Sequence, residues 1–174
     1  MLPIWVAARR VWNPPLRMVI VGAVHIAQAL VVLATACGHD TQIIDPRPAF
    51  AAAARFPGQT LIDGWPDEIM AASPPDARTA VVTLTHDPKV DDPAIFAALA
   101  SEAYYIGCLG STRTHAKRLD RLRDKGVPEA QIARIHAPVG LDIGARTPAE
   151  IALSVMAEVT LRLRRGDLVN LPLS

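Results

Sequence analysis

The stretch from Met18 to Asp45 constrains the fold of this chain more than any other. Its first four residues are all apolar and are typical of a short buried strand, which Gly22 follows as the start of a tight turn. A helical pattern runs from His25 to Cys37, and a second apolar strand ends in Asp45. Strand, glycine turn, helix, strand and terminal acid is the layout of a dinucleotide-binding βαβ unit.

The glycine fingerprint of this unit is incomplete, because Val24 occupies the position of its second glycine. A glycine turn lets backbone amides approach a phosphate, the helix start favours negative charge, and Asp45 could accept hydrogen bonds from ribose hydroxyls. Either a nucleotide-like or pterin-like ligand binds here, or the turn is only structural. The predicted ligand-binding residues of this region are Gly22, Ala23, His25, Asp45 and Arg47.

Length and composition indicate one globular domain. The chain has 174 residues, of which 51% are hydrophobic and 20% charged, enough for a sizeable core. Its net charge of +1 and its aromatic content of 5% argue against a nucleic-acid-binding protein.

Hydropathy and cysteine content bear on where the protein works. The mean hydropathy is +0.23, but no apolar run reaches the roughly 18 residues of a membrane span, so no membrane association is expected. The apolar excess fits buried parallel strands and a homodimer interface. Two cysteines without a CxxC motif and no visible signal peptide predict a cytoplasmic protein with reduced thiols.

The rest of the chain alternates between the two patterns. Further strands are expected at 60–62, 79–85, 103–107 and 135–138, and helices at 67–72, from Asp92-Pro93 onward, at 112–125, 127–132 and 148–165. This alternation predicts an α/β, three-layer Rossmann-like fold, with a mostly parallel sheet and helices on both faces. A double proline separates an N-terminal arm, residues 1–16, from the domain, residues 17–174.

Polar residues follow several of these strands. Ligands of such sheets bind beyond the carboxyl ends of the strands, at the switch in strand order. The side chains and glycines expected to converge there are His25, Asp45, His86, Asp87, Gly107, Gly110 and Ser111.

The pair His86-Asp87 could act as an acid–base dyad, in which the carboxylate fixes the imidazole tautomer. Adjacent residues of an extended chain point to opposite sides, so a capping or loop-ordering role for Asp87 is an equal alternative. The candidates for a catalytic role are His25, His86 and Asp87. No spacing is diagnostic of a metal site, and none is predicted.

The segment Gly107–Arg113 places glycines before a helix whose first turn offers hydroxyls and an arginine. It is either an anion cradle, formed by Gly107, Gly110, Ser111 and Arg113, or a set of structural turns. Cys108 is predicted to be a buried thiol or, alternatively, a sulfur carrier. A loop rich in glycine and proline, 136–147, follows later and should lie against a ligand or a neighbouring protomer, before a Thr147–Glu150 capping box.

Four segments together resemble the XdhC/CoxI family. They are PPLRMVIVGAVHIAQAL (14–30), LTHDPKVDD (84–92), YIGCLGSTRTHAKRL (105–119) and HAPVGLDIGARTPAEIALSVMAEV (136–159). They occur in the same order as in the family and cover nearly the whole chain.

The resemblance implies an accessory protein for the maturation of molybdenum hydroxylases such as xanthine dehydrogenase. Members bind molybdenum cofactor (molybdopterin), assist its sulfuration with a cysteine desulfurase and hand it to the apoenzyme as a chaperone. This chain resembles their carboxy-terminal, Rossmann-like half. It departs from the family in lacking the cysteine-bearing amino-terminal half and in having Val24 where members commonly have glycine.

The leading hypothesis is therefore a cofactor-binding accessory protein, and whether it turns over a substrate is left open. One alternative is an NAD(P)-dependent oxidoreductase that uses Asp45 for the ribose and His86 as acid or base. Another is a non-catalytic module whose apolar surface pairs two protomers.

Overall fold

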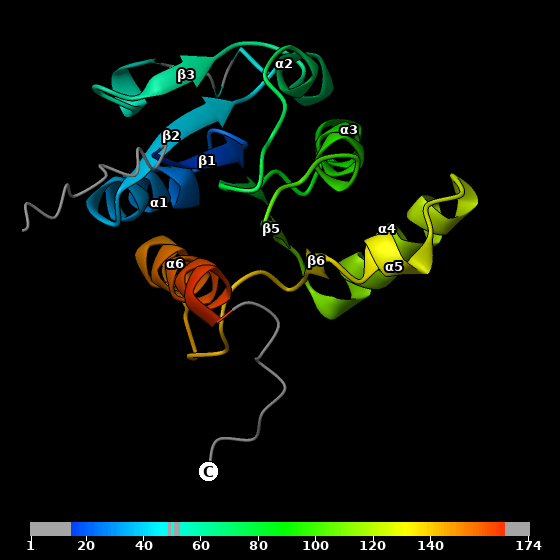
Figure 1. Ribbon diagram of the computed structural model, residues 1–174. Helices are drawn as coiled ribbons and strands as arrows, with labels where there is room; N and C mark the ends of the chain where they lie inside the picture. The colour runs from blue at the N-terminus through cyan, green and yellow to red at the C-terminus, as the bar shows by residue number, and fades with distance from the viewer. Residues whose placement is uncertain (1–14, 49, 51–52, 166–174) are drawn as a thin grey trace, which may run out of the picture.

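A computed structural model describes residues 15–48, 50 and 53–165, and in it six parallel strands form one sheet (Figure 1). The strand order is β3-β2-β1-β4-β5-β6, so the predicted α/β Rossmann-like fold is confirmed. The predicted arm lies almost wholly outside the described residues. The strands are β1 (Leu16–Val21), β2 (His39–Ile44), β3 (Thr60–Ile62), β4 (Thr79–Thr83), β5 (Tyr105–Cys108) and β6 (Ile135–His136).

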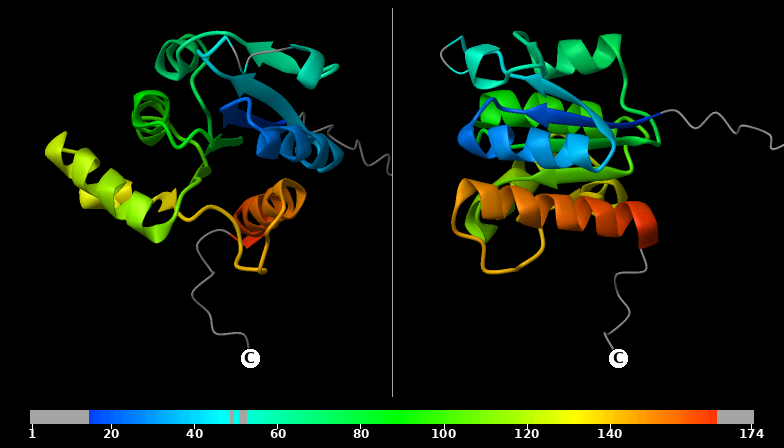
Figure 2. Two further views of the ribbon diagram at one scale, coloured as in Figure 1. Left: turned by 180° about the vertical axis from the view of Figure 1, so that it is seen from behind. Right: turned by 90° about the vertical axis from the view of Figure 1, so that its left-hand side faces the viewer.

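Helices cover both faces of the sheet. On one face α1 packs against α6, and on the other lie α2, α3 and α4, with α4 and α5 reaching outward from the body (Figures 1 and 2). The helices are α1 (His25–Ala36), α2 (Pro66–Ala72), α3 (Pro88–Leu99), α4 (Thr112–Asp124), α5 (Glu129–Ile132) and α6 (Pro148–Arg165), with a 3-10 turn, η1 (Ala53–Arg55).

The apolar run of β1 explains the two cores. Met18 and Ile20 point to the α1–α6 face, and Val19 and Val21 point to the α3–α4 face, all fully buried. Successive side chains of a strand alternate between faces, so a strand covered on both sides must be apolar at every position.

The switch in strand order lies at β1. This strand pairs with β2 on one side and with β4 on the other. The sheet therefore grows from β1 first toward β2 and β3, and then in the opposite direction through β4, β5 and β6. All carboxyl ends meet at one edge, where α1 and α6 also begin (left in the right-hand view of Figure 2). The expected ligand-binding crevice of such a sheet is at this edge, between β1 and β4.

The third helix begins five residues earlier than predicted. Asp87, and not Asp92, caps it, with Pro88 in its first turn and Pro93 inside it. The sequence contains two Asp-Pro starts, and either proline could occupy the first helical position without losing a hydrogen bond. Asp92 instead accepts two hydrogen bonds from Arg121 on α4, at 2.6 and 2.8 Å.

Gly107 lies inside β5 and not past its end. A Cβ at this position would come within 2.5 Å of the Val139 side chain and 2.7 Å of the Tyr105 ring. The glycine is therefore explained by close packing of the chain after β6 against β5.

We expect Gly107→Ala to lower the free energy of unfolding by about 1–3 kcal/mol, because the added methyl overpacks a closed core. Urea denaturation monitored by circular dichroism measures this loss. Gly64→Ala is the control: there a Cβ meets only the Ile69 side-chain tip, at 3.2 Å, and the change should be smaller. Equal effects of the two substitutions would contradict this explanation of Gly107.

Candidate functional site

The glycine turn after β1 is shaped by the protein itself. Gly22 is buried with φ +111°, and a Cβ there would lie 2.7 Å from the Thr85 methyl group. Its N–H donates to the Ile44 carbonyl at 2.8 Å. The close approach of the chain leaving β4 therefore requires this glycine, and its amide is already used.

Asp45, at the end of β2, is fully buried and fully hydrogen-bonded. Its Oδ2 accepts from the Ala23 N–H and from Arg47 Nη2, both at 2.8 Å, and its Oδ1 accepts from the Arg47 N–H at 3.0 Å and Nε at 2.9 Å. A carboxylate has about four acceptor sites, so none is left for ribose hydroxyls. Arg47 also stacks on Phe50, 4.1 Å from the ring centroid, which holds its guanidinium in place.

The ion pair sets the protonation state of Asp45. Burial by itself would raise the pKa of this carboxyl, but the hydrogen bonds from Arg47 and from the Ala23 N–H outweigh it and lower the pKa below its ordinary value. Asp45 is thus charged at neutral pH and anchors the turn.

His25 is exposed at the first residue of α1, and no side chain caps this helix. The first N–H groups of an α-helix have no partner within it and carry a partial positive charge. The start of α1 therefore offers donors for an anion at the carboxyl edge.

The predicted dyad of His86 and Asp87 does not form. The Asp87 side chain accepts from the Lys89 N–H at 3.0 Å and caps α3, and no hydrogen bond joins it to His86 among the described residues. His86 is exposed, with φ +61°, and lines the edge beside β4. The capping alternative for Asp87 is the one that the structure bears out.

The turn between β5 and α4 brings Gly110, Ser111 and Arg113 to the same edge. The Ser111 side chain accepts from the Thr114 N–H at 3.2 Å and so caps α4, while Arg113 is exposed in the first turn. Gly110 has φ +142°, which favours glycine. This turn combines a helix start with an exposed cation.

Neither of the two cysteines suits sulfur chemistry at this edge. Cys108 is fully buried in β5, and burial raises the pKa of its thiol to about 11. Cys37 is exposed but follows the last turn of α1, which runs away from the carboxyl edge. The buried-thiol interpretation of Cys108 is thus confirmed.

Two buried charges near His86 were not predicted from the sequence. Asp91 on α3 and Arg118 on α4 are each only 2% exposed. The Thr85 hydroxyl donates to Asp91 Oδ1 at 2.7 Å, and Arg118 Nη2 donates to the Leu109 carbonyl at 3.0 Å. Burial raises the pKa of Asp91. Helical spacing did carry a signal, because Arg118 lies four residues before the buried Leu122, on the same helix face.

Glu158 of α6 holds the glycine- and proline-rich loop. It accepts from the Tyr105 hydroxyl at 2.6 Å and from the Gly140 N–H at 2.8 Å, and lies 3.3 Å from His136 Nδ1. The expected contact of this loop is therefore at least partly with its own domain. The predicted capping box is confirmed, since Glu150 accepts from the Thr147 N–H at 2.9 Å and donates its own N–H to the Thr147 hydroxyl at 3.3 Å.

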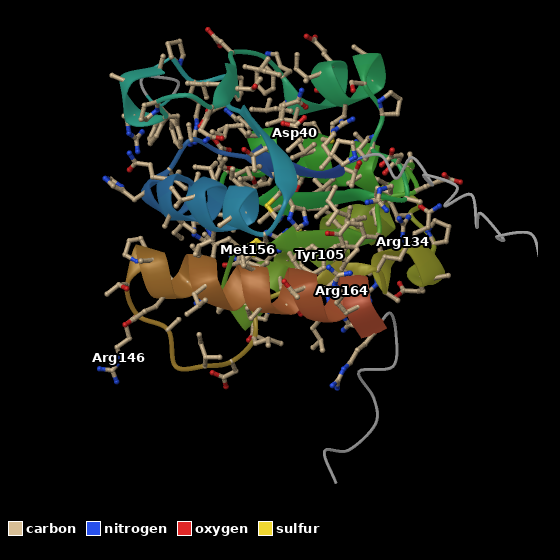
Figure 3. All side chains as sticks on the ribbon, turned by 60° about the vertical axis from the view of Figure 1, so that its left-hand side comes forward. Asp40, Tyr105, Arg134, Arg146, Met156 and Arg164 are labelled. Carbon is tan, nitrogen blue, oxygen red and sulfur yellow. The ribbon has the colours of Figure 1, made fainter. Side chains whose placement is uncertain are left out.

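Arg146 extends from this loop at the carboxyl edge, pointing away from the fold, whereas Arg134 and Arg164 lie at the opposite edge (Figure 3). The Arg146 side chain is exposed.

Within the described segments, no group of three or more His, Cys, Asp or Glu could hold a metal ion. None of the described helices is long and apolar enough to cross a membrane.

Comparison with known proteins relates this chain to a family. The XdhC Rossmann domain matches residues 18–159. The molybdenum cofactor insertion chaperone PaoD of Escherichia coli K12 is 36% identical over 162 residues, which are 92% of this chain and 45% of PaoD. A probable xanthine dehydrogenase subunit of Bacillus subtilis 168 is 33% identical over 158 residues, 90% of this chain and 46% of that protein.

The fold of this chain also matches a solved structure. A crystal structure of a xanthine dehydrogenase from Bacillus halodurans superimposes with a TM-score of 0.76 at 29% identity, over 92% of this chain and 46% of that one. The chain thus spans about half the length of these relatives.

We expect Asp45→Asn to lower the free energy of unfolding at pH 7 by about 3 kcal/mol, because it leaves Arg47 without its ion pair. Since the folded pKa of Asp45 is lowered, its contribution is present above about pH 4 and is lost as the pH falls through the folded value. Urea titrations at several pH values should therefore show the two proteins converging below about pH 4. Asp40→Asn, at an exposed position of the same strand, is the control and should change little.

Glu158→Ala should destabilise the protein by about 2 kcal/mol, because the Tyr105 hydroxyl and the Gly140 amide lose their acceptor. The loop it holds should then be cleaved faster by a protease that cuts after Arg146. Limited proteolysis measures this rate, with the exposed Thr160→Ala of the same helix as control. Unchanged cleavage would show that Glu158 does not order the loop.

Proposed function

We propose that this chain, which belongs to the XdhC family and carries its Rossmann domain, binds molybdenum cofactor at the carboxyl edge of its sheet. In this role it would serve in the maturation of a molybdenum hydroxylase. The name of its relative PaoD, a molybdenum cofactor insertion chaperone, supports this role. The observation that carries the proposal is that Asp45 has all its acceptor sites filled by Ala23 and Arg47, while the helix starts at the same edge still offer hydrogen-bond donors for an anion.

The hydrogen bonds of the Asp45 carboxylate favour a pterin over a dinucleotide as the ligand. A Rossmann domain that binds NAD uses the acid at the end of its second strand to accept ribose hydroxyls. Here that acid is buried and carries four hydrogen bonds from Arg47 and Ala23. A ligand that has a phosphate but needs no such acceptor fits this edge better.

The phosphate of the cofactor would meet the first turns of α1 and α4, where helix N–H groups and the Arg113 guanidinium favour negative charge. His25 and His86 are exposed at the ends of β1 and β4, the two strands that flank the switch point. They would face the molybdenum end of the ligand and could donate hydrogen bonds to its oxygen or sulfur atoms.

The chain would hold the cofactor and would not itself supply sulfur. Its two thiols are Cys108, buried with a raised pKa, and Cys37, at the far end of α1. A sulfuration step would therefore draw sulfur from another protein, such as a cysteine desulfurase, before the cofactor passes to the apoenzyme.

Fluorescence titration with molybdenum cofactor, under anaerobic conditions, tests the proposal. We expect micromolar binding by the wild-type chain and roughly tenfold weaker binding by Arg113→Met, as for the loss of one charged hydrogen bond. Arg123→Met is the matched control: it removes an exposed arginine of the same helix that pairs with Glu129. It should leave the affinity unchanged.

A thermal-shift comparison with NAD and NADP completes this test. Neither nucleotide should raise the melting temperature. No cofactor binding at tens of micromolar, or equal binding by the wild type and by His25→Ala and Arg113→Met, would refute the proposed site. A stabilisation of several degrees by NAD or NADP would favour the oxidoreductase alternative instead.

A further inference from the structure

A pocket of about 480 Å³ lies under the glycine- and proline-rich loop, between this loop and the first two turns of α6. Figure 3 shows the loop passing beside α6 and reaching Arg146 at the carboxyl edge. The pocket is within the size range of small-molecule sites, and its lining is mostly apolar, as such sites usually are. The residues used below are Leu109, Val139, Leu141, Asp142, Ala145 and Ile151.

Backbone hydrogen bonds hold the walls of this pocket in place. The Val139 N–H donates to the Cys108 carbonyl at the end of β5, and the Leu141 N–H donates to the Ser154 carbonyl of α6, both at 3.2 Å. The loop is thereby attached to the sheet on one side and to the helix on the other. The pocket therefore exists before any ligand binds.

Asp142 is the one charged side chain among the described residues that line this pocket. It is exposed, and no hydrogen bond or ion pair joins it to another described residue. The backbone N–H groups of residues 142–145 likewise donate to none of the described residues. The pocket thus combines apolar walls with a carboxylate whose acceptor sites are free and with free amide donors.

The pocket adjoins the proposed contact for the phosphate of the cofactor. Leu109 lines the pocket and directly precedes Gly110 and Ser111, the turn at the start of α4. On the opposite wall, Ile151 lies in the first turn of α6. A ligand whose phosphate meets the start of α4 can therefore extend its remaining part into this pocket.

The pterin ring is the end of molybdenum cofactor that carries neither the metal nor the phosphate. Its faces are flat, and its pyrimidine edge presents an N3–H and a 2-amino group side by side. Two parallel N–H donors match the two oxygens of a carboxylate, as they do when an arginine binds a carboxylate through two hydrogen bonds. A pterin therefore needs what this pocket provides, which is an apolar slot with one free carboxylate.

We propose that this pocket binds the pterin ring of the cofactor, with Asp142 accepting hydrogen bonds from its N3–H and its 2-amino group. The inference rests on the proposed function and extends it, because it assigns pterin recognition to a named residue. A ring with a carbonyl in place of the 2-amino group would set an oxygen against the carboxylate, so the site should reject it.

A fluorescence titration of pterin with the full chain at neutral pH tests this proposal without phosphate or molybdenum. Pterin should bind with a Kd below about 1 mM, as expected for a well-fitted fragment of this size. Lumazine, in which a carbonyl replaces the 2-amino group of pterin, should bind at least about tenfold more weakly, because it lacks a hydrogen bond to a charged group.

Two substitutions in the pocket sharpen the test. Asp142→Asn should weaken pterin binding roughly tenfold and bring the affinities for pterin and lumazine together, because the charged acceptor is lost. Ala145→Phe, at a half-buried position of the wall, should fill the pocket and prevent binding of both rings. Asp40→Asn removes an exposed carboxylate outside the pocket and should bind pterin like the wild type.

Three outcomes would overturn the proposal. These are no pterin binding by the wild type at protein concentrations up to about 1 mM, equal affinity of the wild type for pterin and lumazine, and undiminished pterin binding by Asp142→Asn.

Titration with the whole cofactor separates this inference from the proposed function. If the wild type binds the cofactor and Arg113→Met weakens binding, while Asp142→Asn binds it like the wild type, the pterin assignment is wrong and the proposed function stands. If the wild type binds no cofactor, the proposed function itself is wrong.

Discussion

The carboxylate of Asp45 is the interaction on which the candidate site depends. It joins the end of β2 to the turn after β1 through the Ala23 N–H, and it holds Arg47 through both of its oxygens. The same contact removes the acceptor by which a Rossmann domain recognises ribose.

The charges of the carboxyl edge are divided between two sides. On the β2 side they are closed, because Asp45 and Arg47 satisfy each other. On the β4 and β5 side the Arg113 charge is exposed, next to the exposed His86, and two nitrogens of the buried Arg118 have no hydrogen-bond partner among the described residues. The acceptor that a ribose would need is already hydrogen-bonded, whereas donors for an anion are still available. This edge therefore favours a phosphate-bearing ligand other than a dinucleotide.

Most of the elements could be predicted from apolar periodicity, because the central strands β1, β4 and β5 are covered on both faces and are largely apolar. The failures are local. Two Asp-Pro pairs compete to start α3, and only the packing of Asp92 against Arg121 decides between them. The sequence pattern predicts that Gly107 faces a ligand, but its contacts with Tyr105 and Val139, which form only in the folded chain, explain it.

The sequence by itself determined the family, the βαβ unit with its glycine turn, and the side chains that follow the strands, since these depend on residue type and spacing along the chain. Only the tertiary structure decided which of those side chains are free. The partners of Asp45 include an amide 22 residues away. Asp91 and Arg118 come from different helices, and their unmet hydrogen-bonding groups appear only when both helices pack on the sheet, because burial removes the water that would otherwise satisfy them.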